Sequence, residues 1–222
     1  MNFHATEEQE MLRSFAREFA QGEITPRAHA IETTGELPED LWRALRENNF
    51  FSLLIPEAYG GSAVGYVSYA YILEELARAS AAVAITVSVH NSVTAGPIQN
   101  FGSDAQRSKW LPLLAQSHLG AFALTEPGSG SDAAALTTRA CKNGNSYVLN
   151  GQKTFVTNGK HADLFLVMAR TSPDQKHRGI TSFLVERSTP GLRVGKNIEK
   201  MGLRGSDTVE LFFEDCKVPV EN

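Results

Sequence analysis

Cysteine is scarce in this chain of 222 residues, which contains only Cys141 and Cys216. The two are far apart, form no Cys-x-x-Cys motif and pair with no histidine in the sequence. This scarcity argues against a disulfide framework and against a metal site. It favours free, reduced thiols, as in a cytoplasmic protein.

Long apolar runs, the residue pattern of a signal peptide and an excess of positive charge are also not found in this sequence. The longest mostly apolar run, Ala81–Val89, is far shorter than the roughly 20 residues of a membrane span. Residues 1–4 lead directly into polar residues, without the basic and apolar regions of a signal peptide. The net charge is −4 and no basic cluster is present, so phosphate neutralisation is not expected. We therefore expect no membrane and no nucleic-acid partner, and a cytoplasmic location.

The first half of the chain has helical periodicity. Thr6 and Gln9 fit a capping box, as do Ser103 and Gln106, and Thr25-Pro26 fits a helix start. The segment 81–100 is apolar on nearly all sides and predicts a buried helix, in which His90 is a core histidine. Glu74 and Glu75 lie off the apolar stripe of their helix, which favours a solvated face for both.

The pattern changes near Gly120, where β-branched residues and Asn-Gly turns become frequent. The expected turns are Asn143-Gly144, Asn150-Gly151 and Asn158-Gly159. The expected strands are 121–125, 137–142, 146–150, 154–157, 164–170, 181–186, 192–195 and 209–214. This pattern predicts an α+β protein, with an all-α domain over residues 1–119 and an antiparallel β-barrel or sandwich over residues 120–222.

The most informative segment is Ala123–Asp132, a short apolar run followed by proline, glycine, serine and aspartate. Gly128 and Gly130 allow a tight backbone curl through positive φ, and such a curl can direct several N–H groups at a phosphate. On composition alone, an ordinary Gly/Ser surface loop is the simpler interpretation. Glu126, within this segment, is interpreted as structural.

Three segments in this order and spacing resemble the acyl-CoA dehydrogenase family of flavoproteins. They are Thr125–Asp132, Gly151–Gly159 and Met201–Thr208, and shorter similarities at Pro56–Gly61, Ser88–Ser92 and Phe213–Pro219 extend the resemblance over essentially the whole chain. Family members have a helical domain, a β-barrel domain and a second helical bundle. The resemblance implies that the C-terminal bundle is absent from this sequence.

The resemblance also implies a reaction, a cofactor and partners. The family uses FAD to oxidise an acyl-CoA thioester to the trans-2-enoyl-CoA, and passes electrons to electron-transfer flavoprotein. Its catalytic base is a glutamate of the C-terminal bundle, so no catalytic residue is assigned within residues 1–222. Alone, these residues are expected to bind FAD poorly and to turn over little. A full-length member is expected to be a homotetramer.

The residues implied to contact FAD fall in two segments. Phe122, Leu124 and Thr125 would line the flavin ring, while Gly130 and Ser131 would lie at the pyrophosphate, with Ser131 also reaching the CoA substrate. The remaining members of the site are Phe155, Val156 and Thr157, which would pack on the ring. Without the resemblance, Phe155 and Val156 would be assigned to ordinary core packing. Lys153, beside an Asn-Gly turn, is expected to be solvated.

Other functions remain open at this stage. An acyl-CoA oxidase or a flavin monooxygenase has the same fold, and a non-catalytic binding or assembly module on the same scaffold is a third possibility. Coding sequence for a helical bundle downstream of Asn222 would favour the enzyme. The Ser88–Ser92 run and the Gly179–Val185 segment resemble short-chain and short branched-chain members more than long-chain ones.

Overall fold

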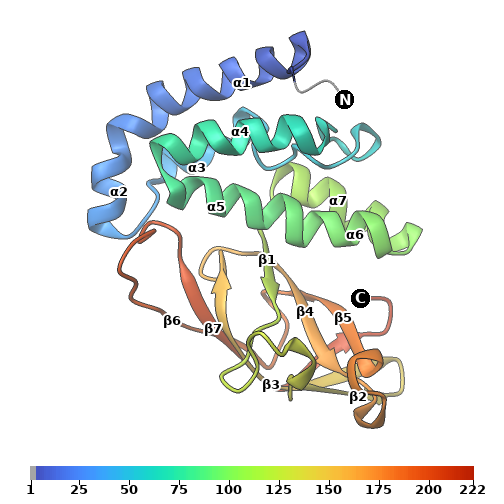
Figure 1. The fold of residues 1–222 in the computed structure, drawn as a ribbon. Coiled ribbons are helices and arrows are strands. Elements are labelled where there is room, and N and C mark those ends of the chain that lie inside the picture. The colour runs from blue at the N-terminus through green and yellow to red at the C-terminus, as the bar shows by residue number, and fades with distance from the viewer. Residues whose placement is uncertain (1–3) are drawn as a thin grey trace. The chain divides into compact units, whose positions relative to one another are not determined.

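The computed structural model describes residues 4–222, which form two compact units (Figure 1). The helical unit comprises residues 4–102, Arg107–Ser117 and Glu199–Ser206. The sheet unit comprises Ser103–Gln106, His118–Ile198 and Asp207–Asn222. The expected change from helices to strands is confirmed, because the last α-helix ends at Gln116 and the first strand begins at Gly120.

The helices run from α1 to α7 and include π- and 3-10 segments. The α-helices are α1 (Glu7–Phe19), α2 (Ala28–Thr34), α3 (Glu39–Glu47), α4 (Gly65–Ala79), α5 (Ala81–Ser88), α6 (Gly96–Phe101) and α7 (Asp104–Gln116). The π-helices are η1 (Ala20–Ile24) and η4 (Val89–Ala95), and the 3-10 segments are η2 (Thr25–Arg27), η3 (Glu57–Tyr59), η5 (Ala133–Ala135) and η6 (Pro173–Gly179). Within residues 4–222, no helix combines the length and apolar content needed to cross a membrane.

Local capping explains where two of these helices begin. The Thr6 hydroxyl accepts from the backbone of Gln9 at 3.2 Å, and the Gln9 side chain accepts from the backbone of Thr6 at 3.0 Å. Ser103 and Gln106 form the same reciprocal pair before α7. Both capping boxes are confirmed. Thr25 differs from its prediction, because it is the first residue of η2 and its hydroxyl donates to the carbonyl of Ala20.

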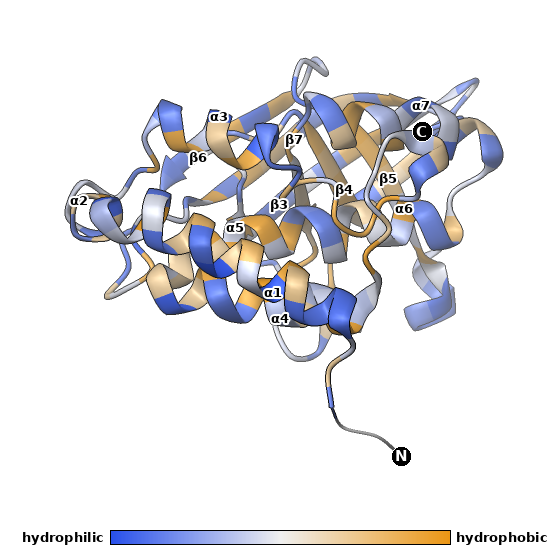
Figure 2. Cartoon of the chain, turned by 90° about the horizontal axis from the view of Figure 1, so that it is seen from above, coloured by the Kyte–Doolittle hydropathy of each residue, from blue (hydrophilic) through white to orange (hydrophobic). Residues whose placement is uncertain are grey.

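Helices α1, α3 and α4 are amphipathic, and hydrophobic and hydrophilic residues alternate along the helices in Figure 2. Their apolar sides supply the core of the helical unit. Its largest fully buried side chains include Phe50, Trp110, Ile24, Ile31, Leu41, Leu45, Ile55, Ile72 and Leu76. Glu75 corrects a prediction. It is 3% exposed rather than solvated, because arginines of α1 surround its carboxylate.

The segment 81–100 is buried over much of its length, as predicted, but it is not one regular helix. The π-helix η4 separates α5 from α6, and Pro97 stands at the start of α6. Proline has no N–H and clashes with the carbonyl one turn earlier, which a locally wider turn accommodates. Within η4, Asn91 accepts from the backbone of Leu54 and donates to the carbonyl of Phe50, so it holds the loop after α3.

The sheet unit contains one sheet of strands β1 to β7. Their bounds are β1 (Gly120–Ala123), β2 (Arg139–Asn143), β3 (Ser146–Thr157), β4 (Leu164–Arg170), β5 (Ile180–Glu186), β6 (Leu192–Asn197) and β7 (Thr208–Pro219). The strand order is β1-β4-β2-β3-β7-β6. Strand β5 lies outside this order and pairs with β4. Most pairs are antiparallel, as predicted, but β1 runs parallel to β4, and so does β2 at its first residue, Arg139. The sheet is therefore mixed.

The sheet curls because β1 also lies beside β3. The Asn158 side chain donates to the carbonyl of Gly120 at 3.3 Å, and the Thr154 N–H donates to the carbonyl of Thr125 at 2.8 Å. From the first bond to the second, the residue number rises on one segment, from 120 to 125, and falls on the other, from 158 to 154, so the two segments are antiparallel. The enclosed core is formed by residues such as Phe165, Phe183, Phe213, Leu149, Leu211 and Val185. The result is a half-barrel.

Two β-bulges interrupt the pairing of β3 with β7. Between Leu149 and Gly151 the extra residue is on β7, and between Lys153 and Val156 it is on β3. Asn150-Gly151 was predicted to be a turn, and this prediction is wrong, because both residues lie within β3. Gly151 has φ +149°, and a Cβ there would lie 2.5 Å from the Thr138 hydroxyl, so only glycine fits. Asn143-Gly144 is the turn between β2 and β3, as expected.

Candidate functional site

The loop after β1 is a tight two-residue turn. Glu126 and Ser129 exchange both backbone hydrogen bonds at 3.0 Å, which leaves Pro127 and Gly128 at the tip. The Ser129 hydroxyl donates to the carbonyl of Asp132 at 2.8 Å and holds the next turn. Gly128 and Gly130 correct a prediction, since neither has a positive φ. A Cβ at either would meet nothing within 4 Å, so the space beside both backbones is open.

Several donors of this loop are left without acceptors. Within the part of the chain that the structure describes, the N–H groups of Gly130 and Ser131 and the hydroxyl of Ser131 make no hydrogen bond. Both residues are exposed. Consecutive N–H groups beside unfilled space suit an anionic ligand, such as the pyrophosphate of a dinucleotide. The loop therefore fits that part of FAD.

Glu126 anchors the loop from within. One carboxylate oxygen accepts from the backbone of Thr138 and from Lys153, and the other accepts from the backbone and hydroxyl of Thr137. Burial raises the pKa of Glu126, but the hydrogen bonds from Lys153, Thr138 and Thr137 outweigh it and hold the pKa at about 2. Both oxygens are committed to the protein, which supports a structural role rather than that of a base.

Lys153 is the cation of this pair, and its prediction as a solvated residue is wrong. It is 0% exposed, and its Nζ atom lies 2.8 Å from Glu126 Oε1 and 2.9 Å from the carbonyl oxygen of Leu124. Burial lowers the pKa of Lys153, and the hydrogen bond to Glu126 opposes that change. A charged residue beside Asn-Gly is typical of a surface turn, so the sequence held no signal for this burial.

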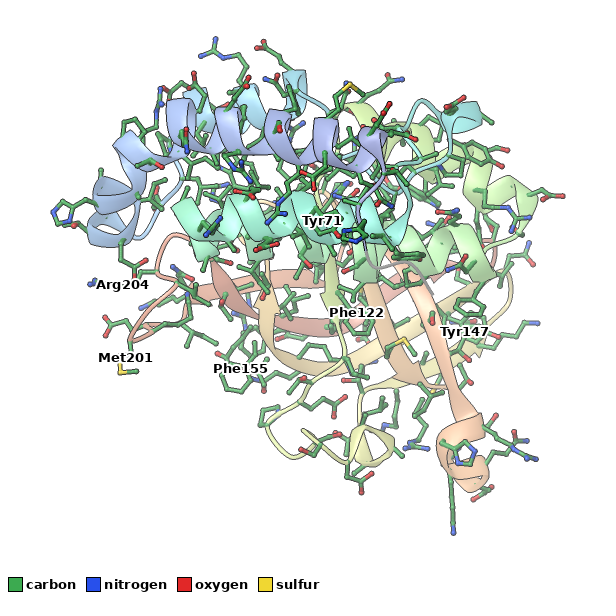
Figure 3. All side chains as sticks on the ribbon, turned by 45° about the horizontal axis from the view of Figure 1, so that its top comes forward. Tyr71, Phe122, Tyr147, Phe155, Met201 and Arg204 are labelled. Atoms are coloured by element: carbon green, nitrogen blue, oxygen red, sulfur yellow. The ribbon has the colours of Figure 1, made fainter. Side chains whose placement is uncertain are left out.

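Phe155 lies at the bulge of β3, where the extra residue turns its ring outward. It has φ +56° and is 64% exposed, while its neighbour Val156 is in the core (Figure 3). A left-handed conformation is uncommon for a bulky residue and costs energy, and such strain concentrates at ligand-binding sites. The bulge thus presents an aromatic face to the outside that a regular strand would have turned inward.

The structure brings the two implied flavin-contact segments together. The Thr154–Thr125 hydrogen bond and the Lys153–Leu124 hydrogen bond join β3 to the end of β1. Phe122 lies on β1 and, like Leu124 and Thr125, is half-buried. On β3, the half-buried Thr157 has a hydroxyl that makes no hydrogen bond within residues 4–222. Hydroxyl and amide donors next to an exposed ring match the chemistry of a flavin edge and face.

A separate open hollow lies on the sheet unit. It has a volume of about 710 Å³ and is lined by Leu136, Thr137, Arg139, Asn150, Arg170 and Pro173, among others. Arg170 donates to the carbonyls of Leu136 and Lys176, so it organises the two loops at the rim. Sequence reasoning gave neither arginine a role.

Comparison with known proteins identifies the family. The N-terminal domain model of the acyl-CoA dehydrogenases matches residues 6–118, and the middle domain model matches residues 121–216. The chain belongs to the acyl-CoA dehydrogenase family, whose members are FAD-dependent enzymes.

Individual relatives are similar over the whole chain. An acyl-CoA dehydrogenase of Bacillus subtilis is 47% identical over 220 residues, which are 99% of this chain and 58% of the relative. The mitochondrial isovaleryl-CoA dehydrogenase of Pongo abelii is 39% identical over 98% of this chain and 52% of its own length. The structure of butyryl-CoA dehydrogenase from Megasphaera elsdenii superposes with a TM-score of 0.95 at 40% identity, covering 100% of this chain and 59% of that one. The chain thus spans little more than half the length of these relatives.

Proposed function

We propose that the protein carrying this chain is an FAD-dependent acyl-CoA dehydrogenase that acts on short-chain substrates. The observation that carries this proposal is a set of unused donors together with an exposed, strained aromatic ring, on two segments that hydrogen bonds hold together. The donors are the N–H groups of Gly130 and Ser131 and the Thr157 hydroxyl, and the ring is that of Phe155. Packing alone gives no reason to hold Phe155 in a strained conformation with its ring exposed.

Each residue of this site has a distinct role in the proposal. Gly130 and Ser131 would hold the pyrophosphate of FAD with their N–H groups, and the Ser131 hydroxyl would also reach the CoA chain. Phe122, Leu124 and Phe155 would supply the walls of the ring site, and Thr125 and Thr157 its hydrogen bonds. The Val156 side chain is in the core, so Val156 would contact the ring only through its backbone. When bound, FAD would supply the oxidising chemistry that removes a hydride from the β-carbon of the acyl chain.

The proton of the α-carbon requires a base, and no residue of this chain is assigned to that role. Glu126 is unsuited, because its two oxygens already accept four hydrogen bonds and its pKa is about 2. By family resemblance, we propose that a glutamate of a C-terminal helical bundle acts as the base. We further propose electron-transfer flavoprotein as the electron acceptor, a homotetramer as the assembly and the cytoplasm as the location.

The proposed substrates are acyl chains of four to five carbons. The support comes from the butyryl-CoA and isovaleryl-CoA dehydrogenases among the similar proteins. A pocket that ends after the fourth or fifth carbon excludes longer chains, because each methylene left outside forgoes about 0.8 kcal/mol of burial.

The test compares residues 1–222 with the complete product of the gene. The complete protein is expected to be yellow, and to reduce an electron acceptor with a kcat/KM that peaks at butyryl- or isovaleryl-CoA. Residues 1–222 alone are expected to be nearly colourless. A peak at octanoyl-CoA or longer would refute the short-chain preference only. Stoichiometric hydrogen peroxide would instead favour an oxidase, and a complete protein without flavin would favour a binding module.

A further inference from the structure

The buried pair of Lys153 and Glu126 holds a peptide group of the proposed flavin site. Lys153 Nζ donates both to Glu126 Oε1 and to the carbonyl oxygen of Leu124. The ammonium is 0% exposed and Glu126 is 5% exposed, so neither can reach a ligand directly. A buried charge pair contributes little net stability compared with apolar packing of the same volume. Its position next to Leu124 therefore calls for another explanation.

The geometry of the peptide bond indicates what the ammonium does. The described residues contain no cis peptide bond, so the Leu124–Thr125 peptide is trans and planar. In a trans peptide the C=O of one residue and the N–H of the next point in opposite directions. Because the Leu124 carbonyl is directed at Lys153, the N–H of Thr125 is directed away from it. That N–H makes no hydrogen bond within residues 4–222.

The neighbouring peptide is held as well. The Thr125 carbonyl accepts from the N–H of Thr154 at 2.8 Å, and the Glu126 N–H donates to the carbonyl of Ser129 at 3.0 Å. Protein partners therefore fix both peptide groups that flank Thr125. Of the N–H and C=O groups of these two peptides, only the N–H of Thr125 is available to a ligand. A cation on the carbonyl of a peptide also polarises the group, which makes the N–H on the other side a stronger donor.

We propose that Lys153 is a positioning residue that fixes and polarises the Leu124–Thr125 peptide, so that the Thr125 N–H donates to an acceptor atom on the edge of the flavin ring. The inference rests on the proposed function, since it requires the protein to bind FAD. Glu126 balances the charge of Lys153 and holds it in place. Lys153 does not itself touch flavin or substrate.

The matched comparison uses two substitutions that break the same ion pair. Lys153→Met removes the donor to Leu124, whereas Glu126→Gln leaves the ammonium in contact with the Leu124 carbonyl. Lys142→Met, at an exposed position of β2, is the control. The readouts are far-UV circular dichroism and melting temperature for folding, and FAD affinity and the visible flavin spectrum for the site, in the complete protein.

Lys153→Met is expected to weaken FAD binding by about tenfold or more and to shift the flavin spectrum, because the Thr125 N–H is no longer held in place and polarised by the ammonium. Glu126→Gln is expected to retain most of the affinity at a similar loss of melting temperature, and Lys142→Met is expected to match the wild type. Equal loss of affinity in Lys153→Met and Glu126→Gln, or an unchanged flavin spectrum in a folded Lys153→Met protein, would overturn the proposal.

A measurement on the wild type covers the case in which Lys153→Met does not fold. The Thr125 amide is expected to exchange its hydrogen quickly without FAD, and to become protected by at least about tenfold with FAD. No gain in protection would overturn the positioning role while FAD still binds. Failure of the wild-type complete protein to bind FAD at all would instead overturn the proposed function, and this inference with it.

Discussion

The carboxylate of Glu75 on α4 accepts a hydrogen bond of 2.8 Å from Nη2 of Arg17 on α1, 58 residues away in sequence. Arg13 adds a second contact through Nε at 2.9 Å. The hydrogen bonds from Arg17 and Arg13 outweigh burial and lower the pKa of Glu75 to about 2. The pair therefore fixes the packing of α1 on α4 through charge as well as apolar contact.

Glu75→Gln is expected to destabilise the helical unit by about 2–3 kcal/mol, because charge-assisted hydrogen bonds to a buried acceptor are lost. Glu74→Gln is the control, since Glu74 is half exposed and lies 3.5 Å from Arg13. Its cost is expected to be less than about 0.5 kcal/mol, as for surface ion pairs. Chemical denaturation of both variants measures the difference, and equal costs would contradict this account.

The free energy of unfolding is expected to fall as the pH is lowered, over the range in which His90 binds a proton in the unfolded chain but not in the folded protein. Burial lowers the pKa of His90 from 6.5 to about 4, so the folded protein keeps the ring neutral where the unfolded chain binds a proton. The unfolded state therefore gains relative to the folded state as pH falls from about 6.5 to 4. His90→Gln is expected to flatten the stability profile in that range. An unchanged slope between pH 6.5 and 4 would show that His90 does not titrate as inferred.

A substitution at Phe155 is expected to affect ligand binding and stability differently. Phe155→Gly relieves the left-handed strain, worth about 1–3 kcal/mol, against an entropic cost of about 0.5–1 kcal/mol. The melting temperature is therefore expected to stay the same or rise, while FAD affinity falls about tenfold through loss of the aromatic contact. Phe155→Trp, which keeps an aromatic face, is the control for affinity. A parallel loss of stability and affinity would mean that Phe155 serves packing.

The unpaired hydroxyls give a fourth test. Ser131→Ala and Thr157→Val are each expected to weaken FAD binding or flavin reduction by about 1–3 kcal/mol, since a buried partner on the ligand would lose its hydrogen bond. Ser188→Ala, at an exposed turn, is expected to have no effect. Titration of the apoprotein with FAD and rapid-mixing reduction rates measure both quantities. If both site variants behave like the control, these two hydroxyls lie outside the site.

Sequence reasoning succeeded where an interaction is local. The capping boxes of Thr6 and Ser103 each span four residues, and the strand 164–170 is predicted with its observed bounds. It failed where the partner comes from elsewhere. The burial of Glu75 depends on α1, and that of Lys153 depends on Glu126, 27 residues earlier. No periodicity within α4 or β3 contains that information.

The candidate site could likewise be predicted from the sequence only in part. The order of motifs predicted the segments around Thr125 and Phe155, but their contact depends on β1 lying beside β3, and no pattern within either segment contains that information. The orientation of Phe155 depends on the bulge, because strict alternation would place Phe155 on the same face as the buried Lys153, two residues earlier.

The two bulges between β3 and β7 compensate each other. Ser146 pairs with Pro219 before the first bulge and Thr157 pairs with Thr208 after the second, and the alignment at both ends of the ladder is the same. Removing the extra residue of one strand alone would slip the rest of the ladder by one position and turn its buried side chains outward. The extra residues of β3 and β7 can therefore be gained or lost in evolution only as a pair, so a length change near Phe155 should be accompanied by one near Asp215.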